Sequence, residues 1–377
     1  MAVKLVLETG GHLRRGTPIT IGLEPGTMPD GPCVLEPGDI PAQVSGNRLM
    51  AVIPAADAGV SLAYDIVPGG GGGMTVIEKP GMLEFRESGK LVTGYMYRPD
   101  CGYQFVSKPY FYPLNLNGDS LSRPVPRAGE PDPEDLDHPH HRSLWVAFGD
   151  VNGAEIWNEP EGHGYQKHIK FERIFHGPAA AGFKALLEWT SAGGKRLATE
   201  TRSFTAWRST AGGRLFDLTV KFEASAGAVR LGDTKEGGFC AVRLQEEMRA
   251  DRTGVITNSN GGHGEKECWG HRASWVDYSG TLAGKKLGLA ILDHPESFRF
   301  PTHWHVRDYG LFAANPFGLS HYGTGWLKDG SYTIPAGESL VFKYRVFLHE
   351  GDCNTANVAD RWIDFAYPPF VEPAAAK

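Results

Sequence analysis

The sequence predicts an all-β fold: a large antiparallel β-sandwich, preceded by a small β domain and closed by a C-terminal helix. Hydrophobic and polar residues alternate along many segments, as half-buried antiparallel strands require. Gly, Pro, Asn-Gly and Asp-Gly breaks separate these segments, which is typical of strands joined by tight turns. Helical periodicity is scarce, so the pattern favours a sandwich or barrel over a helical fold.

The alternation is clearest in LFDLTVKF, where Phe216, Leu218, Val220 and Phe222 share one face of a predicted strand. The same period recurs between residues 340 and 348. Further strands are expected at residues 90–97, 183–189 and 287–293, and turns at Asn117-Gly118 and Asn152-Gly153.

The expected helix covers residues 354–367. Asn354 suits the N-cap position, and Val358, Trp362 and Phe365 recur at helical spacing before Pro368. The final EPAAAK is expected to be a frayed tail without a role.

Five consecutive glycines, Gly69 to Gly73, mark the predicted boundary between two units. We therefore expect a small N-terminal β domain at residues 1–73 and a large β-sandwich domain, with the catalytic cleft, at residues 74–370.

Composition excludes several classes of protein. The chain has 377 residues and a formal net charge of −6 without any basic run, so no nucleic-acid partner is expected. Neither a signal peptide nor a membrane-spanning stretch is recognisable, so we expect a cytoplasmic protein without a membrane partner. The five cysteines are widely spaced and form no CxxC pair, which indicates free thiols. The oligomeric state stays open.

The densest cluster of reactive side chains is in LDHPHHRSLWVAFGDVNGAEIW, which contains His138, His140, His141 and Arg142. In an extended segment His138 and His140 would share one side and His141 would face the other. Such imidazoles suit general acid–base catalysis, because their pKa lies near neutral pH. They could instead hold a divalent metal such as Zn, Mn or Fe, and histidines in loops often only bond a backbone carbonyl.

Two further segments carry candidate groups. THWHVRDYG supplies His303 and His305 close to Arg307 and Asp308, and we expect this segment to border the same pocket as the first cluster. In KECWGHRASWVDY an aromatic ring, Trp269, lies near Arg272. Sugars are bound by such mixtures, because a ring's C–H face stacks on an aromatic side chain while polar groups take the hydroxyls.

The segments DHPHHRSLWVAFGDVNGAEIW, GDTKEGGF and HWHVRDYGLFAANPFG resemble signature segments of a bacterial family labelled PmoA-like or methane oxygenase. We carry over the family and not that activity, because the membrane subunit of that name needs spanning segments. The chain, including KPYFYPLNLNGDSLSRPVP, is more loosely similar to the β-supersandwich of galactose mutarotases. That similarity implies a sugar-binding cleft on a concave sheet, with histidine and a carboxylate as acid and base.

The resulting hypothesis is a carbohydrate-active enzyme, an epimerase, lyase or hydrolase that acts on a sugar or glycoside. The sequence assigns no cofactor, although a divalent metal is possible. A metal-dependent oxygenase or hydrolase and a non-catalytic carbohydrate-binding protein are the alternatives. The predicted catalytic residues are His138, His140, His141, Arg142, Lys235, Glu236, His303, His305 and Asp308, and the predicted substrate-binding residues are Trp145, Trp269, Arg272, Arg307 and Asn315.

Overall fold

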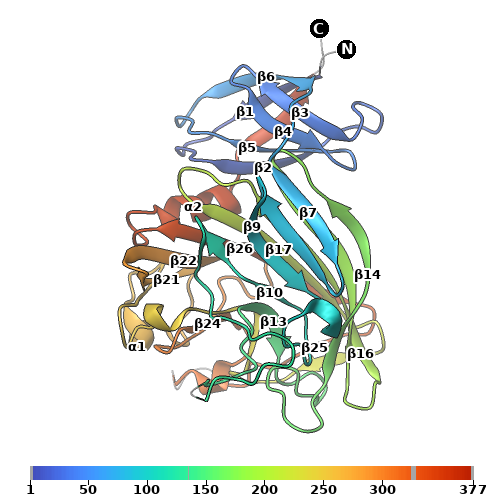
Figure 1. Cartoon of the computed structure of the whole chain (residues 1–377), viewed down its shortest axis with the longest axis vertical. Coiled ribbons are helices and arrows are strands. Elements are labelled where there is room, and N and C mark those ends of the chain that lie inside the picture. Colours follow the sequence, from blue (N-terminus) through green and yellow to red (C-terminus); the bar gives the residue numbers. More distant parts are fainter. Residues whose placement is uncertain (1–2, 135, 324–327, 375–377) are drawn as a thin grey trace.

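The computed structural model describes residues 3–134, 136–323 and 328–374. Two eight-stranded antiparallel sheets pack face to face, and a seven-stranded antiparallel sheet lies at one end of them (Figure 1). The predicted all-β class and the large antiparallel sandwich are therefore confirmed.

The first sheet of the sandwich, called sheet I here, contains in spatial order β23 (Trp304–Val306), β24 (Leu311–Ala314), β19 (Gly237–Arg243), β13 (Leu144–Phe148), β10 (Tyr110–Tyr112), β9 (Lys90–Met96), β8 (Met82–Glu87) and β7 (Met74–Lys79). Sheet II contains β14 (Tyr165–Phe175), β15 (Ala180–Thr190), β16 (Arg196–Trp207), β17 (Arg214–Glu223), β26 (Ser339–Glu350), β22 (Lys285–Asp293), β21 (Trp275–Leu282) and β20 (Val255–Asn258). The smaller elements are the pairs β11 (Asn115–Leu116) with β12 (Asp119–Ser120) and β18 (Val229–Leu231) with β25 (Tyr332–Ile334), and the helical segments η1 (Pro99–Cys101), η2 (Glu246–Met248), α1 (Gly264–Cys268), η3 (Leu319–His321) and α2 (Val358–Ala366).

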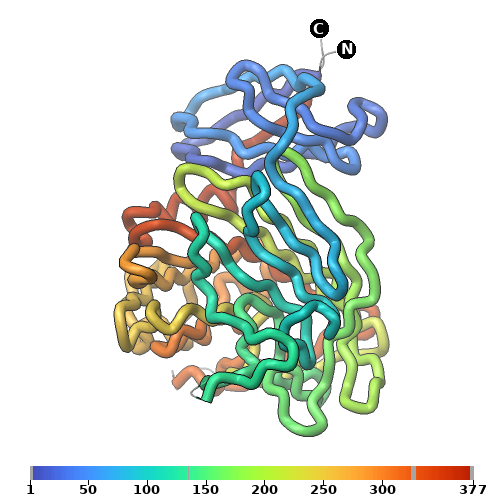
Figure 2. The backbone as a smooth tube through the Cα atoms, viewed as in Figure 1, coloured from blue at the N-terminus to red at the C-terminus, as the bar shows by residue number. Residues whose placement is uncertain are grey.

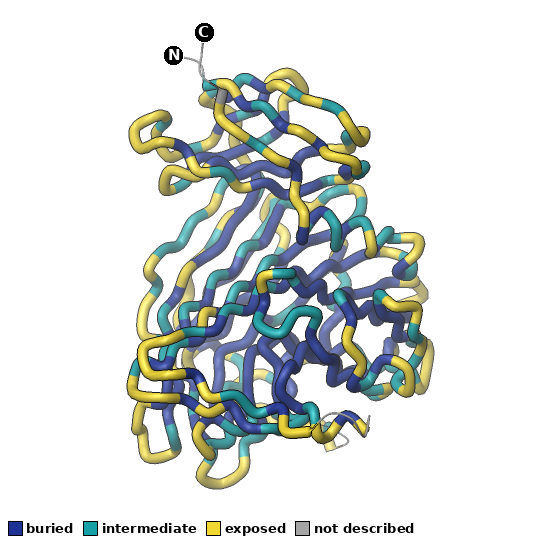
Figure 3. Tube along the Cα trace, turned by 180° about the vertical axis from the view of Figure 1, so that it is seen from behind, coloured by how far each residue is buried: buried dark blue, intermediate teal, exposed yellow. Residues whose placement is uncertain are grey.

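The main hydrophobic core fills the space between sheets I and II. The four residues predicted to share a face of β17 are all buried there, which confirms the alternation. Phe239 of sheet I and Phe342 of sheet II stack across the interface with ring centroids 3.9 Å apart. In Figure 3 the buried positions run along the strands, and the exposed ones gather in the loops and at the edges.

The seven-stranded sheet, called the N-terminal sheet here, has its own core. Its order is β2 (Thr17–Gly22), β5 (Arg48–Ile53), β4 (Ile40–Val44), β3 (Gly31–Glu36), β6 (Ser61–Pro68), β1 (Val3–Glu8) and β27 (Phe370–Ala374). The glycine run 69–73 connects β6 to β7 of sheet I.

After α2 the chain returns to this sheet, where the first and last described strands, β1 and β27, lie side by side (Figures 1 and 2). The expectation of a frayed tail is wrong for Glu372 and Pro373, because they pair with Val6 and Leu5 of β1. The last three residues, 375–377, lie outside the described part of the chain. The division at residue 73 stays a proposal, and β27 would join the first unit.

Both predicted Asn-Gly turns form. Asn117 has a φ of 53° and Gly118 a φ of 99°, and Asn152 and Gly153 have values of 52° and 83°. Positive φ at both central residues is the type I′ conformation, which matches the twist of the flanking strands. The first turn joins β11 to β12, and the second lies between bridged Val151 and Ala154.

The expected C-terminal helix forms as α2, but it begins later than predicted. Asn354 is not the N-cap, because residues 354–357 form a turn in which the Asn357 N–H donates to the Asn354 carbonyl. Asn357 occupies the cap position instead. The helix joins the two units: Asp364 accepts a 3.0 Å hydrogen bond from Arg14 of the N-terminal unit. Among the described helices, none is long and apolar enough to cross a membrane.

Candidate active site

The outer face of sheet I, opposite the main core, carries a row of side chains that pair across four strands. Trp145 of β13 lies opposite Ala241 of β19, Ala241 opposite Ala313 of β24, and Ala313 opposite His305 of β23. Because successive residues of a strand point to opposite faces, their neighbours Leu144 and Trp304 point into the main core. The two small alanines leave space above the sheet between Trp145 and His305.

The histidine segment 138–141 is a turn above this face and not the extended stretch that we predicted. His138 has a φ of 47°, and the His141 N–H donates to the His138 carbonyl at 3.0 Å. The predicted alternation is therefore wrong, because the turn brings all three rings together. The His138 and His141 rings are parallel with centroids 4.8 Å apart, and His140 meets His141 edge to face at 4.5 Å.

Asp137 fixes this turn to the sheet. Its carboxylate accepts hydrogen bonds from Arg123 at 2.7 Å and from Arg243 of β19 at 2.5 Å. Burial would raise the pKa of Asp137, but the hydrogen bond and charge of Arg243 outweigh it, so that this pKa falls to about 2. The carboxylate is therefore ionised at neutral pH and holds the two arginines beside the histidines.

Aromatic rings cover the space above the alanines. Trp157 is fully buried, and its ring centroid lies 5.2 Å from Trp145, 5.6 Å from His141 and 6.5 Å from His305. Glu155 positions this residue, because its carboxylate accepts the backbone N–H of Trp157 at 2.7 Å. Trp157 thus joins the histidine turn to the strand that carries His305.

A cavity of about 720 Å³ opens beside the turn. Of the residues predicted for the site, His140 and Arg142 line it. Arg142 is 5% exposed and donates to Gln104 Oε1 at 2.9 Å. The other walls are Pro99, Tyr103, Phe105, Val106, Ala128, Gly129, Asp132, Pro139, Asn158, Glu159 and Pro160.

A buried ion pair between Lys108 and Glu159 lies beside Arg142. Lys108 is 1% exposed, and its Nζ donates to the Trp157 carbonyl at 2.9 Å and to Glu159 Oε1 at 3.1 Å. Burial alone would raise the pKa of Glu159, but Lys108 and Arg142 more than offset it, so that this pKa is lowered. Glu159 is therefore a carboxylate at neutral pH.

His305 and Glu236 lie deeper along the same face. His305 is 1% exposed, and burial is the main cause that lowers its pKa to about 4, although Glu236 acts to raise it. Lys235 donates to Glu236 Oε1 at 2.5 Å. Asn315, predicted to bind substrate, instead supports this loop, because its amide donates to the Lys235 carbonyl at 3.1 Å.

Two histidines of the turn, His140 and His141, are also held neutral. Burial, followed by the charges of Lys108 and His138, lowers the pKa of His140 to about 3. Burial likewise lowers the pKa of His141 well below its usual value. Nε2 of both rings is buried without a hydrogen-bond partner among the described residues. At neutral pH both rings are therefore uncharged.

The predicted residues of the 303–308 segment and its neighbours are only partly brought together. Arg307 lies over the Tyr309 ring, which in turn stacks on His138 at 5.0 Å, so the two segments touch. His303 instead stacks on Tyr322, and the Asp308 backbone bonds Glu265.

Two predicted substrate-binding residues also lie apart from the cavity. The Arg272 guanidinium donates to the carbonyls of Pro301 at 2.8 Å and Phe300 at 2.9 Å, which stabilises a loop. Trp269 packs edge to face against Tyr322, with ring centroids 5.7 Å apart.

No group of three or more His, Cys, Asp or Glu side chains with a geometry suited to a metal ion occurs in the described ranges. In the turn, His138 and His141 stack face to face, so their nitrogens do not converge on one point.

Four residues around the site were missed by the sequence analysis: Lys108, Trp157, Glu159 and Tyr309. Trp157 closes the histidine segment itself, so the signal was present in the quoted residues. Lys108 opens KPYFYP, and Glu159 follows two residues after Trp157, but nothing in their spacing shows that they pair.

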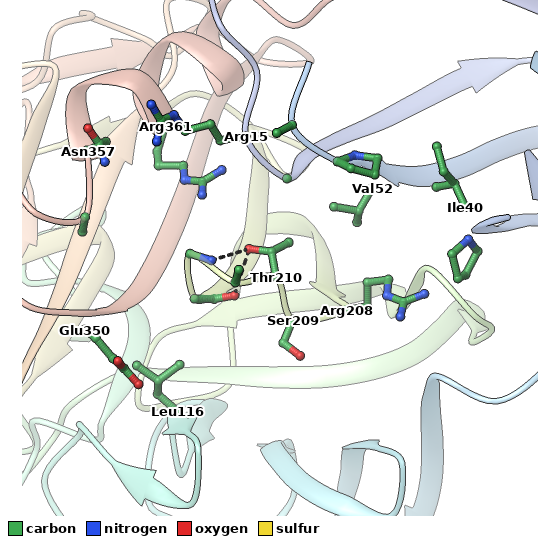
Figure 4. Close-up of a pocket in the computed structure, with 18 of the residues that line it drawn as sticks. Arg15, Ile40, Val52, Leu116, Arg208, Ser209, Thr210, Glu350, Asn357 and Arg361 are labelled. Atoms are coloured by element: carbon green, nitrogen blue, oxygen red, sulfur yellow. Dashed lines mark hydrogen bonds between the residues drawn. The ribbon is translucent and has the colours of Figure 1, made fainter. Parts of the chain in front are cut away.

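A second cavity of about 810 Å³ lies between the N-terminal sheet and the sandwich (Figure 4). It contains none of the predicted site residues. Thr210, Arg15, Arg208 and Arg361 are among the residues that line it.

Comparison with known proteins gives a family but no activity. A family model described as a family of unknown function, DUF6807, matches residues 82–363. No curated protein sequence matches the chain.

The chain also matches solved structures of glycosidases, at low sequence identity. The match to an α-mannosidase from Enterococcus faecalis V583 has 9% sequence identity and a TM-score of 0.47. The aligned region covers 99% of this chain and 46% of the mannosidase chain. A glycosyl hydrolase family 38 protein from Enterococcus faecalis has 9% identity and a TM-score of 0.38, covering 99% and 47%. The GH36 α-galactosidase AgaB from Geobacillus stearothermophilus has 13% identity and a TM-score of 0.38, covering 74% and 42%. The chain spans less than half of each of these proteins, and at such scores the likeness defines no activity.

Proposed function

The chain belongs to the DUF6807 family, and we propose that it is a carbohydrate-active enzyme whose active site is the cavity beside the histidine turn. The observation that carries this proposal is His140, a neutral imidazole that lines an open cavity and whose buried Nε2 has no hydrogen-bond partner among the described residues. Burying a polar atom without a partner is unfavourable, so such an atom is a candidate for contact with a substrate.

The lining of the cavity supports a sugar as the substrate class. Tyr103 and Phe105 offer flat apolar rings, while Gln104, Asn158 and Arg142 offer polar groups. A sugar presents both kinds of surface, since its C–H face stacks on aromatic rings and its hydroxyls form hydrogen bonds. The volume, about 720 Å³, falls in the range of small-molecule sites.

His140 would transfer a proton, and Arg142 would orient the substrate. Glu159 and Lys108 would hold Arg142 and the Trp157 segment in place, because both are hydrogen-bonded within the wall of the cavity. A purely structural role for His140 is less well supported, because its Nε2 bonds no described residue.

The test is a His140→Gln variant compared with His176→Gln, which changes an exposed histidine outside the site. Substrates are found first by screening wild-type protein against aryl glycosides and oligosaccharides. Loss of His140 should lower kcat by roughly a hundredfold or more and leave KM and melting temperature nearly unchanged, which is the usual effect of removing a general acid or base. Equal activity of both variants would contradict the proposal.

A further inference from the structure

Arg142 has hydrogen-bond donors that the protein does not use. A guanidinium carries five N–H donors. In Arg142, Nη1 donates to Gln104, Nη2 lies 3.6 Å from Glu159 Oε2, and Nε has no described partner. The side chain is 5% exposed and lines the cavity, and a buried donor without an acceptor is unfavourable. Such an arginine is prepared for an acceptor that the protein itself does not supply.

The charge of Arg142 is also only loosely compensated. Glu159, the nearest carboxylate, is closer to Lys108, at 3.1 Å, than to Arg142. Its Oε1 also accepts the Ser107 hydroxyl at 2.8 Å. The remaining carboxylate of the lining, Asp132, is exposed to solvent. The missing acceptor is therefore best supplied by an anion, and a planar carboxylate fits the guanidinium fork.

The carboxylates near the cavity are poorly suited to glycoside hydrolysis. Most glycosidases need one carboxyl group that stays protonated at neutral pH and gives its proton to the leaving oxygen. Glu159 has a lowered pKa and is bonded to Lys108. Glu236 is bonded to Lys235, and its pKa is lowered as well because Lys235 and His305 outweigh its burial. Both are therefore anions. Among the residues that line the cavity, His140 supplies a neutral imidazole that can transfer a proton.

We propose that the substrate is a uronate, a sugar that carries a ring carboxylate, and that the enzyme cleaves it by β-elimination. This inference rests on the function proposed above and narrows it to a lyase. The uronate carboxylate binds Arg142, which withdraws charge and makes the proton on the adjacent ring carbon, C5, more acidic. His140 Nε2 takes that proton.

The electrons of the broken C5–H bond form a double bond between C4 and C5, and the bond between C4 and the glycosidic oxygen breaks. The imidazolium of His140 then gives its proton to the departing oxygen, so neither water nor an oxidant is consumed. The products are a sugar with a free hydroxyl and a 4,5-unsaturated uronate.

The surroundings of His140 fit this order of events. The imidazole begins neutral, as a base must, because burial and Lys108 disfavour its charged form. Glu159 and Glu236 act in the opposite direction. A bound uronate would add a further negative charge close by and strengthen the base when the substrate arrives. Arg142 would also stabilise the negative charge that develops on the carboxylate as the proton leaves.

The experiment compares polygalacturonate and alginate with neutral glycans of the same linkage type, using wild-type protein. Elimination creates a double bond conjugated with the carboxylate, which is followed by ultraviolet absorbance, and hydrolysis creates none. The inference expects rising absorbance with at least one uronate polymer and none with the neutral glycans. Cleavage of neutral glycans without absorbance would overturn the lyase but keep the carbohydrate enzyme, whereas neither cleavage nor binding of any glycan would overturn the proposed function itself.

Variants of Arg142 then test whether this residue binds the uronate carboxylate. Arg142→Gln should lower kcat/KM for the uronate at least a hundredfold, while Arg196→Gln, an exposed arginine at the start of β16, should not change it. Arg142→Lys keeps the charge and serves if the Gln variant does not fold. Since Lys cannot form the two parallel hydrogen bonds, it should restore only part of the activity, and full activity of a folded Gln variant would refute the role of Arg142.

Discussion

Replacing Trp157 with alanine should both destabilise the protein and change the titration of its buried histidines. The indole is fully buried between the histidine turn and His305. A buried aromatic side chain removes about 150–250 Å² from water, so at about 25 cal/mol per Å² the change costs roughly 4–6 kcal/mol. Measured Trp-to-Ala changes in cores cost about 3–5 kcal/mol, and we expect about 4 kcal/mol. Urea denaturation followed by circular dichroism measures this free energy of unfolding.

The second result expected of Trp157→Ala distinguishes it from general destabilisation. Burial is the main cause that lowers the pKa of His305 to about 4. Water that enters the space left by the indole should move this pKa upward toward 6.5, which a histidine-selective NMR titration detects. The control is Trp362→Ala in α2, which packs against a separate cluster and should leave His305 unchanged. A loss below about 1 kcal/mol together with an unchanged His305 would refute the packing described here.

Two further outcomes concern stability. Acid should destabilise the protein from about pH 6.5 downward. The pKa of His305 is 6.5 in the unfolded chain and about 4 in the folded protein, so below pH 6.5 protons bind the unfolded chain preferentially. The contribution of His305 to the free energy of unfolding is therefore complete above pH 6.5 and is lost as the pH falls to 4. At 1.36 kcal/mol per unit this amounts to about 3 kcal/mol, and a His305→Gln variant that loses as much stability as wild type over this range would contradict it. Gly254→Ala should lower the melting temperature, because the new Cβ would lie 2.1 Å from the backbone carbonyl oxygen of Met248, which cannot move aside as a side chain can, at a cost of about 1–3 kcal/mol. Gly11→Ala, where nothing lies within 4 Å of the added Cβ, is its control, and equal melting temperatures would contradict the contact.

Much of the fold could be predicted because its signals are local. Alternation along β17 and the two Asn-Gly turns depend on residues that are neighbours in sequence. The pairing of β27 with β1 could not be predicted, since it joins residues more than 360 positions apart and EPAAAK carries no strand pattern of its own. The start of α2 was missed because the residue-type rule for N-caps does not describe this start: Asn357 has a left-handed φ of 53° and its side chain makes no capping hydrogen bond.

The site was predictable in composition but not in geometry. Clustered imidazoles and Arg142 could be selected by residue type alone. The turn could not, because the positive φ of His138 depends on Asp137 and the distant arginine of β19 that binds it. The pairing of Lys108 with Glu159 likewise needs two loops to meet, and it is this pairing that leaves Arg142 with unused donors.

The central claim is that a sugar binds in the cavity between His140 and Arg142, and a crystal structure with a bound oligosaccharide tests it most directly. Soaking the inactive His140→Gln variant with a trigalacturonate would preserve the substrate. We expect a sugar carboxylate within hydrogen-bond distance of the Arg142 guanidinium, at about 2.7–2.9 Å, with ring carbon C5 facing residue 140. A sugar bound elsewhere on the protein, with this cavity holding only solvent, would show that the cavity is not the active site.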